Sequence, residues 1–279
     1  MDRKIKKYFI GKPAKDGAGV KLYRTFGYQE ILEFDPFLMM DFFDSTNPED
    51  YIKGFPWHPH RGIETVTYLI SGKIEHQDSL GNKGVINNGD CQWMTAGSGI
   101  LHQEMPIASP RMLGVQLWLN LHAKDKMIPP NYEDITYDMI PVYRDENEAV
   151  HIIAGIYNGL EGPMKGDRDI EPTFFDVELA PDSEFVFNLN PTLNAYAFLI
   201  EGEANFDVVN ENIIHYPNGV LYEEGDTIRI NTKGKAARFL LLSGKKINEP
   251  VAWGGPIVMN TKEELNLAFK ELDEGTFIK

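Results

Sequence analysis

The sequence predicts an all-β protein in which two similar β-domains follow one another and one short helix ends the chain. The first reason is that short apolar stretches alternate with glycine, asparagine and aspartate turn signals. Residues 64–70 form a β-rich run that ends at Ser71-Gly72, and further turn signals lie at 87–90 and 97–99. Such spacing is typical of a β-sandwich or barrel. The other two reasons are an internal repeat and a capped helical segment near the end of the chain.

The repeat relates two strand-like segments that lie 130 residues apart, Tyr-Leu-Ile-Ser-Gly-Lys at 68–73 and Phe-Leu-Ile-Glu-Gly-Glu at 198–203. The turn signal Gly89-Asp90 likewise has a counterpart in Gly225-Asp226. A repeat of this length indicates that a β-domain has been duplicated.

The boundary between the two domains is expected within residues 125–145. The tandem prolines Pro129-Pro130 in this stretch favour extended chain, as in a turn or linker. We therefore assign residues 1–135 to an N-terminal domain and residues 136–279 to a C-terminal domain that includes the helix.

The helix is expected from Thr261, which can form a capping box with Glu264. Apolar residues then recur at helical spacing as far as Leu272, and Gly275 is a stop signal. This apolar stripe has to pack on something, and we expect a β-domain rather than an external partner.

Two pairs of residues point to a metal site. His58 and His60 form an i, i+2 pair, and His102 and Glu104 form another that begins 42 residues after His60. Residues i and i+2 of a strand face the same side, so two neighbouring strands can aim all four side chains at one point. Imidazole with carboxylate and no thiolate suits iron, manganese, nickel, copper or zinc, and argues against a closed structural zinc site. Four ligands leave positions open, as in catalytic sites.

The metal is expected in the N-terminal domain alone. An offset of 130 residues places Asn188 and Asn190 where His58 and His60 stand in the first copy. No His-x-His or His-x-Glu pair occurs after residue 104.

Composition limits the partners and the location. The 279 residues are 42% hydrophobic, as in an ordinary globular protein, and carry 27 Lys and Arg against 42 Asp and Glu, a net charge of −15. Such a charge repels phosphate backbones and anionic lipid, so direct nucleic-acid and membrane binding are not expected. The single cysteine, Cys91, fits a reducing compartment, and the longest apolar run near the N-terminus, residues 8–10, is too short for a signal peptide. We expect a cytoplasmic protein.

Longer motifs extend from residue 35 to the end of the chain. They lie at 35–41, 58–62, 64–69, 78–82, 92–97, 102–106, 248–250 and 255–261. With these motifs the chain resembles the pirin family of the cupin superfamily. The resemblance implies a bicupin, that is, two tandem cupin-type β-barrels of the double-stranded β-helix kind.

The resemblance also implies one mononuclear metal ion per chain, most often iron and here expected as iron(II), although other divalent transition metals suit the ligands. The residues that match the family's metal ligands are His58, His60, His102 and Glu104. Glu64 occupies the place of the carboxylate ligand of many cupins, and we expect it to hold a hydrogen bond instead.

Pirin-like proteins are associated with quercetin 2,3-dioxygenase activity, in which dioxygen opens the heterocycle of a flavonol with loss of carbon monoxide. The partner implied is then a small flavonol-like chelator, and Glu104 is the expected catalytic residue, which takes the proton of the 3-hydroxyl. The family also suggests an alternative, a non-enzymatic iron-dependent redox-sensing regulator that binds a protein partner in transcription or metabolism. A metal-dependent isomerase or lyase fits the ligands but has no supporting motif.

Overall fold

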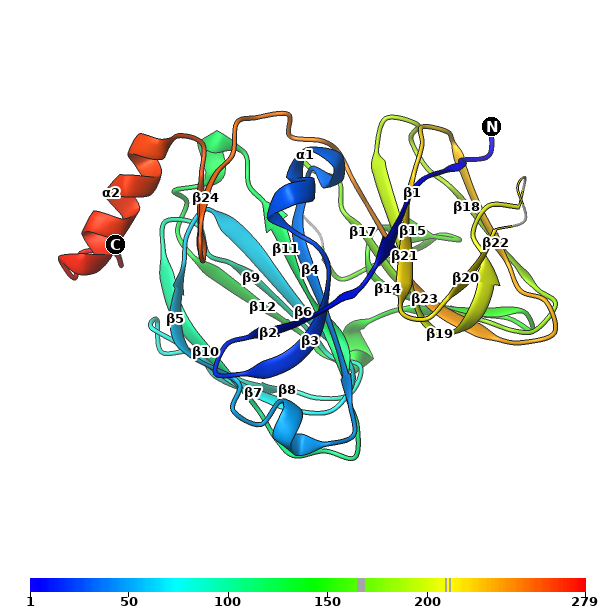
Figure 1. Ribbon diagram of the computed structural model, residues 1–279, viewed down its shortest axis with the longest axis horizontal. Coiled ribbons are helices and arrows are strands. Elements are labelled where there is room, and N and C mark those ends of the chain that lie inside the picture. Colours follow the sequence, from blue (N-terminus) through cyan, green and yellow to red (C-terminus); the bar gives the residue numbers. More distant parts are fainter. Residues whose placement is uncertain (165–168, 209, 211) are drawn as a thin grey trace. The chain divides into compact units, whose positions relative to one another are not determined.

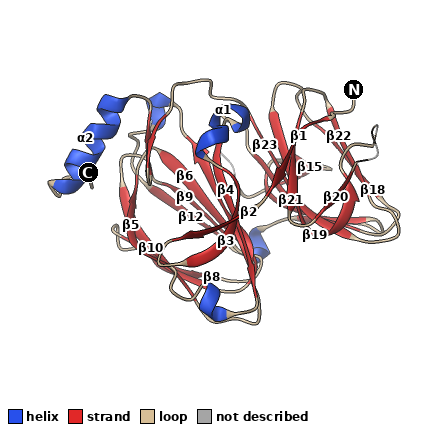
Figure 2. Ribbon diagram, viewed as in Figure 1, coloured by secondary structure: helices blue, strands red, loops and turns tan. Residues whose placement is uncertain are grey.

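The computed structural model describes residues 1–164, 169–208, 210 and 212–279. Strands dominate these residues and the helices are short, as Figure 2 shows. The all-β prediction is therefore confirmed. None of the helices in the described part of the chain is long and apolar enough to cross a membrane.

The chain forms two compact units, each built from separate stretches of sequence. The first unit contains Lys12–Glu33, Phe37–Tyr137 and Ile247–Lys279, and the second contains Met1–Gly11, Phe34–Pro36 and Asp138–Lys246. This grouping by contacts differs from the division at residue 135 because the first strand of the chain joins the second unit and the C-terminal helix joins the first. The division of the sequence into domains 1–135 and 136–279 stays a prediction.

The first unit consists of antiparallel strands in two main sheets and one hairpin (Figure 1). Its strands are β2 (Lys12–Asp16), β3 (Val20–Phe26), β4 (Phe37–Ser45), β5 (Phe55–His60), β6 (Ile63–Ser71), β7 (Ile74–Asp78), β8 (Lys83–Ile86), β9 (Cys91–Thr95), β10 (Ile100–Pro106), β11 (Met112–Asn120), β12 (Asn131–Ile135), β24 (Ala252–Gly254) and β25 (Ile257–Met259). The larger sheet has the order β12-β9-β6-β11-β4-β3-β2, the smaller sheet has the order β5-β10-β7-β8, and β24 pairs with β25. Leu69 and Met112 of the larger sheet share an apolar cluster with Ile74 and Ile86 of the smaller one, so the two sheets pack face to face.

The second unit contains the remaining strands. They are β1 (Ile5–Ile10), β13 (Val142–Arg144), β14 (Glu148–Ala154), β15 (Ile156–Tyr157), β16 (Leu160–Glu161), β17 (Thr173–Leu179), β18 (Glu184–Asn188), β19 (Asn194–Asn205), β20 (Ile213–His215), β21 (Asn218–Tyr222), β22 (Thr227–Asn231) and β23 (Ala237–Gly244). The main sheet runs β1-β21-β19-β23-β17-β14-β13, and β18, β20 and β22 pair beside this path. Aromatic rings fill the interior: Tyr157 stacks on Phe185 with centroids 5.5 Å apart, and Phe175 and Phe239 belong to the same cluster.

The two segments of the predicted repeat occupy similar local structures. Residues 68–73 cover the end of β6 and residues 198–203 lie within β19. Each segment contains a glycine with positive φ, 115° at Gly72 and 79° at Gly202. At Gly202 a Cβ atom would lie 2.1 Å from the carbonyl oxygen of Ala236, so the close approach of β19 to its neighbour requires glycine.

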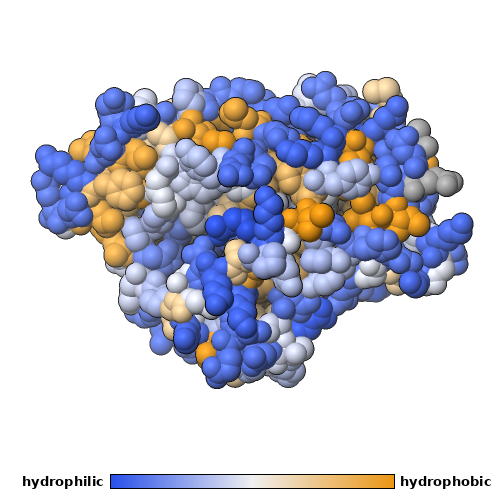
Figure 3. All heavy atoms as spheres, viewed as in Figure 1, coloured by the Kyte–Doolittle hydropathy of each residue, from blue (hydrophilic) through white to orange (hydrophobic). Residues whose placement is uncertain are grey.

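The helical segments are short except for the last one. They are α1 (Ile31–Phe34), α2 (Lys262–Asp273) and 3-10 turns at Tyr28–Glu30, Pro48–Asp50, Ala123–Asp125 and Tyr137–Met139. The predicted capping box of α2 is confirmed, since Thr261 Oγ1 accepts from the backbone N–H of Glu264 at 3.2 Å and Glu264 Oε2 accepts from that of Thr261 at 3.0 Å. Ala268 of α2 packs in a cluster with residues of β25, which confirms that the helix packs on a β-unit. Apolar side chains also gather beside this helix on the face shown in Figure 3.

Candidate metal centre

Two paired strands of the first unit carry the predicted metal ligands. β5 and β10 run antiparallel, and their register places His58 opposite His102. Because side chains alternate along a strand, His58 and His60 can face the same side. Gly54, just before β5, has φ 58°, and a Cβ atom there would lie 2.5 Å from the carbonyl oxygen of Glu104. A side chain at this position would therefore disturb the pairing that brings the ligands together.

The three imidazole rings converge through their Nε2 atoms. Nε2 of His58 lies 3.0 Å from Nε2 of His60 and 2.9 Å from Nε2 of His102. The ligand atoms of all three lie within 4.8 Å of one another, and among the described residues this is the cluster that could hold a metal ion. The structure thus brings three of the four predicted ligands to one point.

Contacts on the far side of two rings determine which nitrogen carries a proton. Nδ1 of His58 lies 2.9 Å from the carbonyl oxygen of Pro56, and Nδ1 of His60 lies 3.1 Å from that of Pro256. A carbonyl oxygen can only accept, so in each pair Nδ1–H is the donor. In the neutral ring Nε2 then keeps its lone pair for a metal, and the carbonyl fixes the orientation of the ring.

Burial keeps two of these rings neutral. Burial lowers the pKa of His60 to about 3, with the neighbouring His58 as a second cause. Burial likewise lowers the pKa of His102 well below its usual value, and His60 and His58 add to the effect. Lone pairs that face each other at such short distances repel unless a cation lies between them. The donor set therefore fits a transition-metal ion, which binds the neutral imidazole nitrogen.

The spacing of the nitrogens indicates whether one ion can bind them together. Two nitrogens that are each about 2.1 Å from one ion lie about 3.0 Å apart at a right angle and about 3.4 Å apart at the tetrahedral angle. The observed separations of 3.0 and 2.9 Å are short enough for one transition-metal ion to bind these nitrogens, and iron(II), manganese(II), nickel(II) and zinc all bind imidazole.

Glu104 lies two residues beyond His102 on β10 and is buried, but its carboxylate is not part of the three-histidine cluster. Oε1 accepts a hydrogen bond from Thr67 Oγ1 at 2.8 Å, and Oε2 accepts one from Gln116 Nε2 at 2.8 Å. Each carboxylate oxygen has two lone pairs, so these bonds leave one on each oxygen for a metal or a proton. The assignment of Glu104 as fourth ligand stays a prediction.

Two residues beside the centre are not evident from the motifs. Tyr132 of β12 places its hydroxyl 3.4 Å from Nδ1 of His102, and its ring stacks on His76 with centroids 5.4 Å apart. The sequence suggests that His76 is an exposed or hydrogen-bonded hairpin residue, but the structure buries it, and its Nδ1 has no hydrogen-bond partner among the described residues. Alternation with the apolar Ile74 on the same strand is the signal that could have revealed the inward position of His76.

Glu64 has the hydrogen-bonding role expected for it. Its Oε1 accepts from Thr95 Oγ1 at 2.7 Å and its Oε2 accepts from Trp93 Nε1 at 3.0 Å. Both donors lie on β9, next to β6 in the larger sheet. The carboxylate therefore helps to fix the pairing of β6 with β9.

Comparisons with known proteins agree with this architecture. The sequence matches the family models Pirin over residues 19–119 and Pirin C-terminal cupin domain over residues 174–278. A Pirin-like protein of Caulobacter vibrioides is 43% identical over 278 residues, which cover 99% of each chain. The crystal structure of quercetin 2,3-dioxygenase from Acinetobacter baumannii has a TM-score of 0.90 at 30% identity and covers 99% of both chains.

A more distant structure, that of a bacterial pirin from Escherichia coli in complex with nickel(II), shares the fold. Its TM-score is 0.65 at 20% identity, over 86% of this chain and 98% of that one. The two family models and the full-length likeness to the Caulobacter protein decide the family. The chain belongs to the pirin family and consists of two cupin-type domains.

Proposed function

We propose that this pirin is a mononuclear metal-dependent oxygenase of the quercetin 2,3-dioxygenase type, with iron(II) held by His58, His60, His102 and Glu104. The observation that carries the proposal is the convergence of three imidazole Nε2 atoms, two of which have their Nδ1–H groups fixed by backbone carbonyls. The likeness to the Acinetobacter quercetin 2,3-dioxygenase, at 30% identity over 99% of the chain, supports the reaction type.

The ligand set leaves room for substrate. When bound, iron(II) supplies open positions at which dioxygen and the 3-hydroxyl/4-keto pair of a flavonol can meet. The three histidines are neutral ligands, so Glu104 contributes the only negative charge among the four. The nickel(II) of the Escherichia coli pirin supports a transition metal in this fold.

Glu104 is the base in this proposal. Hydrogen bonds from Thr67 and Gln116, one to each oxygen, hold its buried carboxylate in one orientation. The 3-hydroxyl proton of the flavonol passes to a carboxylate oxygen of Glu104, which leaves the substrate as an enolate. The enolate then reacts with dioxygen, and the heterocycle opens with loss of carbon monoxide. The reaction is expected in the cytoplasm, a location that rests on the sequence alone.

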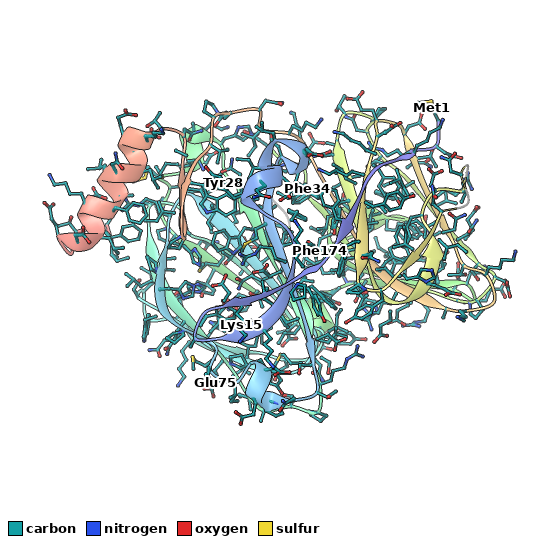
Figure 4. All side chains as sticks on the ribbon, viewed as in Figure 1. Met1, Lys15, Tyr28, Phe34, Glu75 and Phe174 are labelled. Atoms are coloured by element: carbon teal, nitrogen blue, oxygen red, sulfur yellow. The ribbon has the colours of Figure 1, made fainter. Side chains whose placement is uncertain are left out.

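The test is to measure dioxygen uptake and carbon monoxide release from quercetin by protein loaded anaerobically with iron(II). The wild type should exceed a free-iron control, and Glu104→Gln should retain metal and bind quercetin but turn it over much more slowly. Glu75→Gln is the matched control, because Glu75 is an exposed glutamate on the neighbouring strand β7 (Figure 4) and should leave the rate unchanged.

Two results would count against the proposal. Carbon monoxide release no greater than that of free iron would end the dioxygenase assignment and would favour the regulator, whose partner affinity should differ between iron(II) and iron(III). Equal rates in Glu104→Gln and wild type would remove Glu104 as the base while leaving the oxygenase in place.

A further inference from the structure

A series of aromatic rings begins at one of the candidate metal ligands. The ring of His60 contacts the indole of Trp118 edge-on, with centroids 5.0 Å apart and planes at 87°. Trp118 belongs to β11 and is buried, with 9% of its surface exposed. Trp118 is also a member of an apolar cluster that contains Leu38 and Met94 of the larger sheet.

The series continues to the surface of the same unit. Trp118 lies 5.8 Å from Trp253 of β24, and Trp253 lies 5.6 Å from Tyr28, both distances measured between ring centroids. The indole N–H of Trp253 donates to the carbonyl oxygen of Gly255 at 2.7 Å, which fixes this middle ring. Tyr28 is 64% exposed, and Figure 4 shows it beside the strand that carries Trp253. We call Trp118, Trp253 and Tyr28 the ring path.

The composition of the ring path is what an electron-transfer route requires. Tryptophan and tyrosine are the aromatic side chains that can lose one electron to a strong oxidant, whereas phenylalanine resists oxidation. Rings in contact exchange electrons quickly because tunnelling falls off steeply with distance. The path also ends at a phenol in water, which can release its proton on oxidation and so hold the radical away from the buried site.

A centre that uses dioxygen needs such an electron-transfer route to the surface. When an oxidant reaches the metal without a flavonol to consume it, the nearby groups that can be oxidised include the ligand histidines, the buried Trp118 and Tyr132. Oxidation there is damaging, since it alters the ligands themselves. An electron delivered from Tyr28 moves the damage to an exposed side chain, where a small reductant of the ascorbate or thiol class can repair it.

We propose that the ring path carries electrons from Tyr28 through Trp253 and Trp118 to the metal centre and so protects the centre during turnover without substrate. The inference rests on the proposed iron site but does not require flavonol as the substrate. With hydrogen peroxide as the oxidant, one electron comes from iron(II), which becomes iron(III), and one comes from Tyr28, which becomes a neutral phenoxyl radical. These two electrons, the phenolic proton and one proton from water convert the peroxide to two molecules of water.

The experiment mixes iron(II)-loaded full-length protein with hydrogen peroxide in the absence of flavonol, freezes it within milliseconds and records the organic radical by electron paramagnetic resonance. The wild type should give a tyrosyl signal that metal-free protein lacks. The signal should disappear in Tyr28→Phe and in Trp253→Phe. Trp253→Tyr differs from Trp253→Phe by one hydroxyl and should restore it, because tyrosine can be oxidised. Tyr137→Phe is the control, since Tyr137 is an exposed tyrosine of the same unit outside the ring path.

Peptide mapping by mass spectrometry gives a second readout. After repeated peroxide treatment, Trp253→Phe should show more oxidation at Trp118 and at the ligand histidines than wild type or Trp253→Tyr, with equal iron content at the start. A radical and an oxidation pattern that are the same in Trp253→Phe and wild type would overturn the proposal. So would a radical that survives Tyr28→Phe but is lost in Tyr132→Phe, because Tyr132 lies next to His102 and offers a different route.

The outcomes separate this inference from the proposed function. A Trp253-dependent radical in protein that releases no carbon monoxide from quercetin would retain the ring path and reject the dioxygenase. Carbon monoxide release without a Trp253-dependent radical would retain the dioxygenase and reject the ring path. Protein that binds no iron at all would overturn both.

Discussion

Replacement of Arg61 by methionine should destabilise the first unit and weaken its metal site. Arg61 follows His60 directly, and its guanidinium is buried. Nε donates to the carbonyl oxygen of Ser98 at 2.7 Å, Nη2 to that of Phe277 at 2.7 Å, and Nη1 to the carboxylate of Glu271 at 2.6 Å. One side chain thus ties the end of β5 to the C-terminal segment by two hydrogen bonds and to the loop between β9 and β10 by a third.

The size of the effect follows from these partners. Methionine leaves the carbonyl groups of Ser98 and Phe277 without their donor, and each buried polar group that loses its partner typically costs about 1–3 kcal/mol, whereas Glu271 keeps its pair with Lys279. Methionine preserves much of the apolar volume, which limits the cost of an empty cavity. With a urea slope of about 2 kcal/mol per molar, a loss of about 4 kcal/mol lowers the unfolding midpoint by about 2 M. The C-terminal segment also supplies the Pro256 carbonyl that orients His60, so metal affinity should fall about 10–100-fold.

The assay is urea unfolding followed by tryptophan fluorescence, with metal affinity measured separately by competition with a chelator. All four tryptophans of the chain belong to the first unit, so their fluorescence reports on that unit. Lys21→Met is the control, because Lys21 pairs with Asp50 in the same unit but its side chain is 58% exposed. The loss of that pair should cost no more than about 1 kcal/mol.

The reasoning would be refuted if the free energies of unfolding of Arg61→Met and Lys21→Met differed by no more than about 1 kcal/mol, which is the range of exposed ion pairs. A large loss of stability with unchanged metal affinity would retain the structural role of Arg61 and reject its link to His60.

Three further predictions follow from the centre and its neighbours. His60→Ala should abolish tight metal binding, whereas His215→Ala, at an exposed histidine of the second unit, should retain one ion per chain by elemental analysis. The metal-free protein should lose stability as the pH falls from 6.5 toward about 3, because the unfolded chain takes up a proton at His60 that the folded chain does not. This slope reaches about 1.4 kcal/mol per pH unit, and urea titrations of His60→Leu should show it reduced. Gly84→Ala places a Cβ atom 2.4 Å from Nε2 of His76, so we expect the free energy of unfolding to fall by about 1–3 kcal/mol. Urea unfolding followed by tryptophan fluorescence measures this change. An unchanged unfolding midpoint would show that His76 can move aside.

Local patterns made much of this structure predictable. Alternation along a strand places His58 and His60 on one face, and this rule depends only on their spacing of two residues. The capping box of α2 is equally local, since Thr261 and Glu264 bond to each other within one turn. The all-β class follows in the same way from short apolar runs between turn residues.

Contacts over long sequence distances could not be predicted. The carbonyl that orients His60 belongs to Pro256, 196 residues away, and every residue has a backbone carbonyl, so no residue type identifies this one. The same holds for Glu104, whose partners Thr67 and Gln116 come from two strands of the other sheet. The i, i+2 rule predicts the face on which Glu104 lies, but these donors decide where its carboxylate points.

The C-terminal segment gives these long-range contacts a common origin. It provides Pro256 to His60, Glu271 and Phe277 to Arg61, and the carbonyl of Val258 to the buried ammonium of Lys126 at 3.1 Å. Lys126 also donates to the carbonyl of Gly62, so its ammonium group joins the turn after β5 to the C-terminal segment. A chain cut at residue 135 retains every predicted ligand but lacks the groups that orient His60 and anchor Arg61. The candidate metal centre therefore depends on sequence from both halves of the chain, although all of its predicted ligands lie in the first.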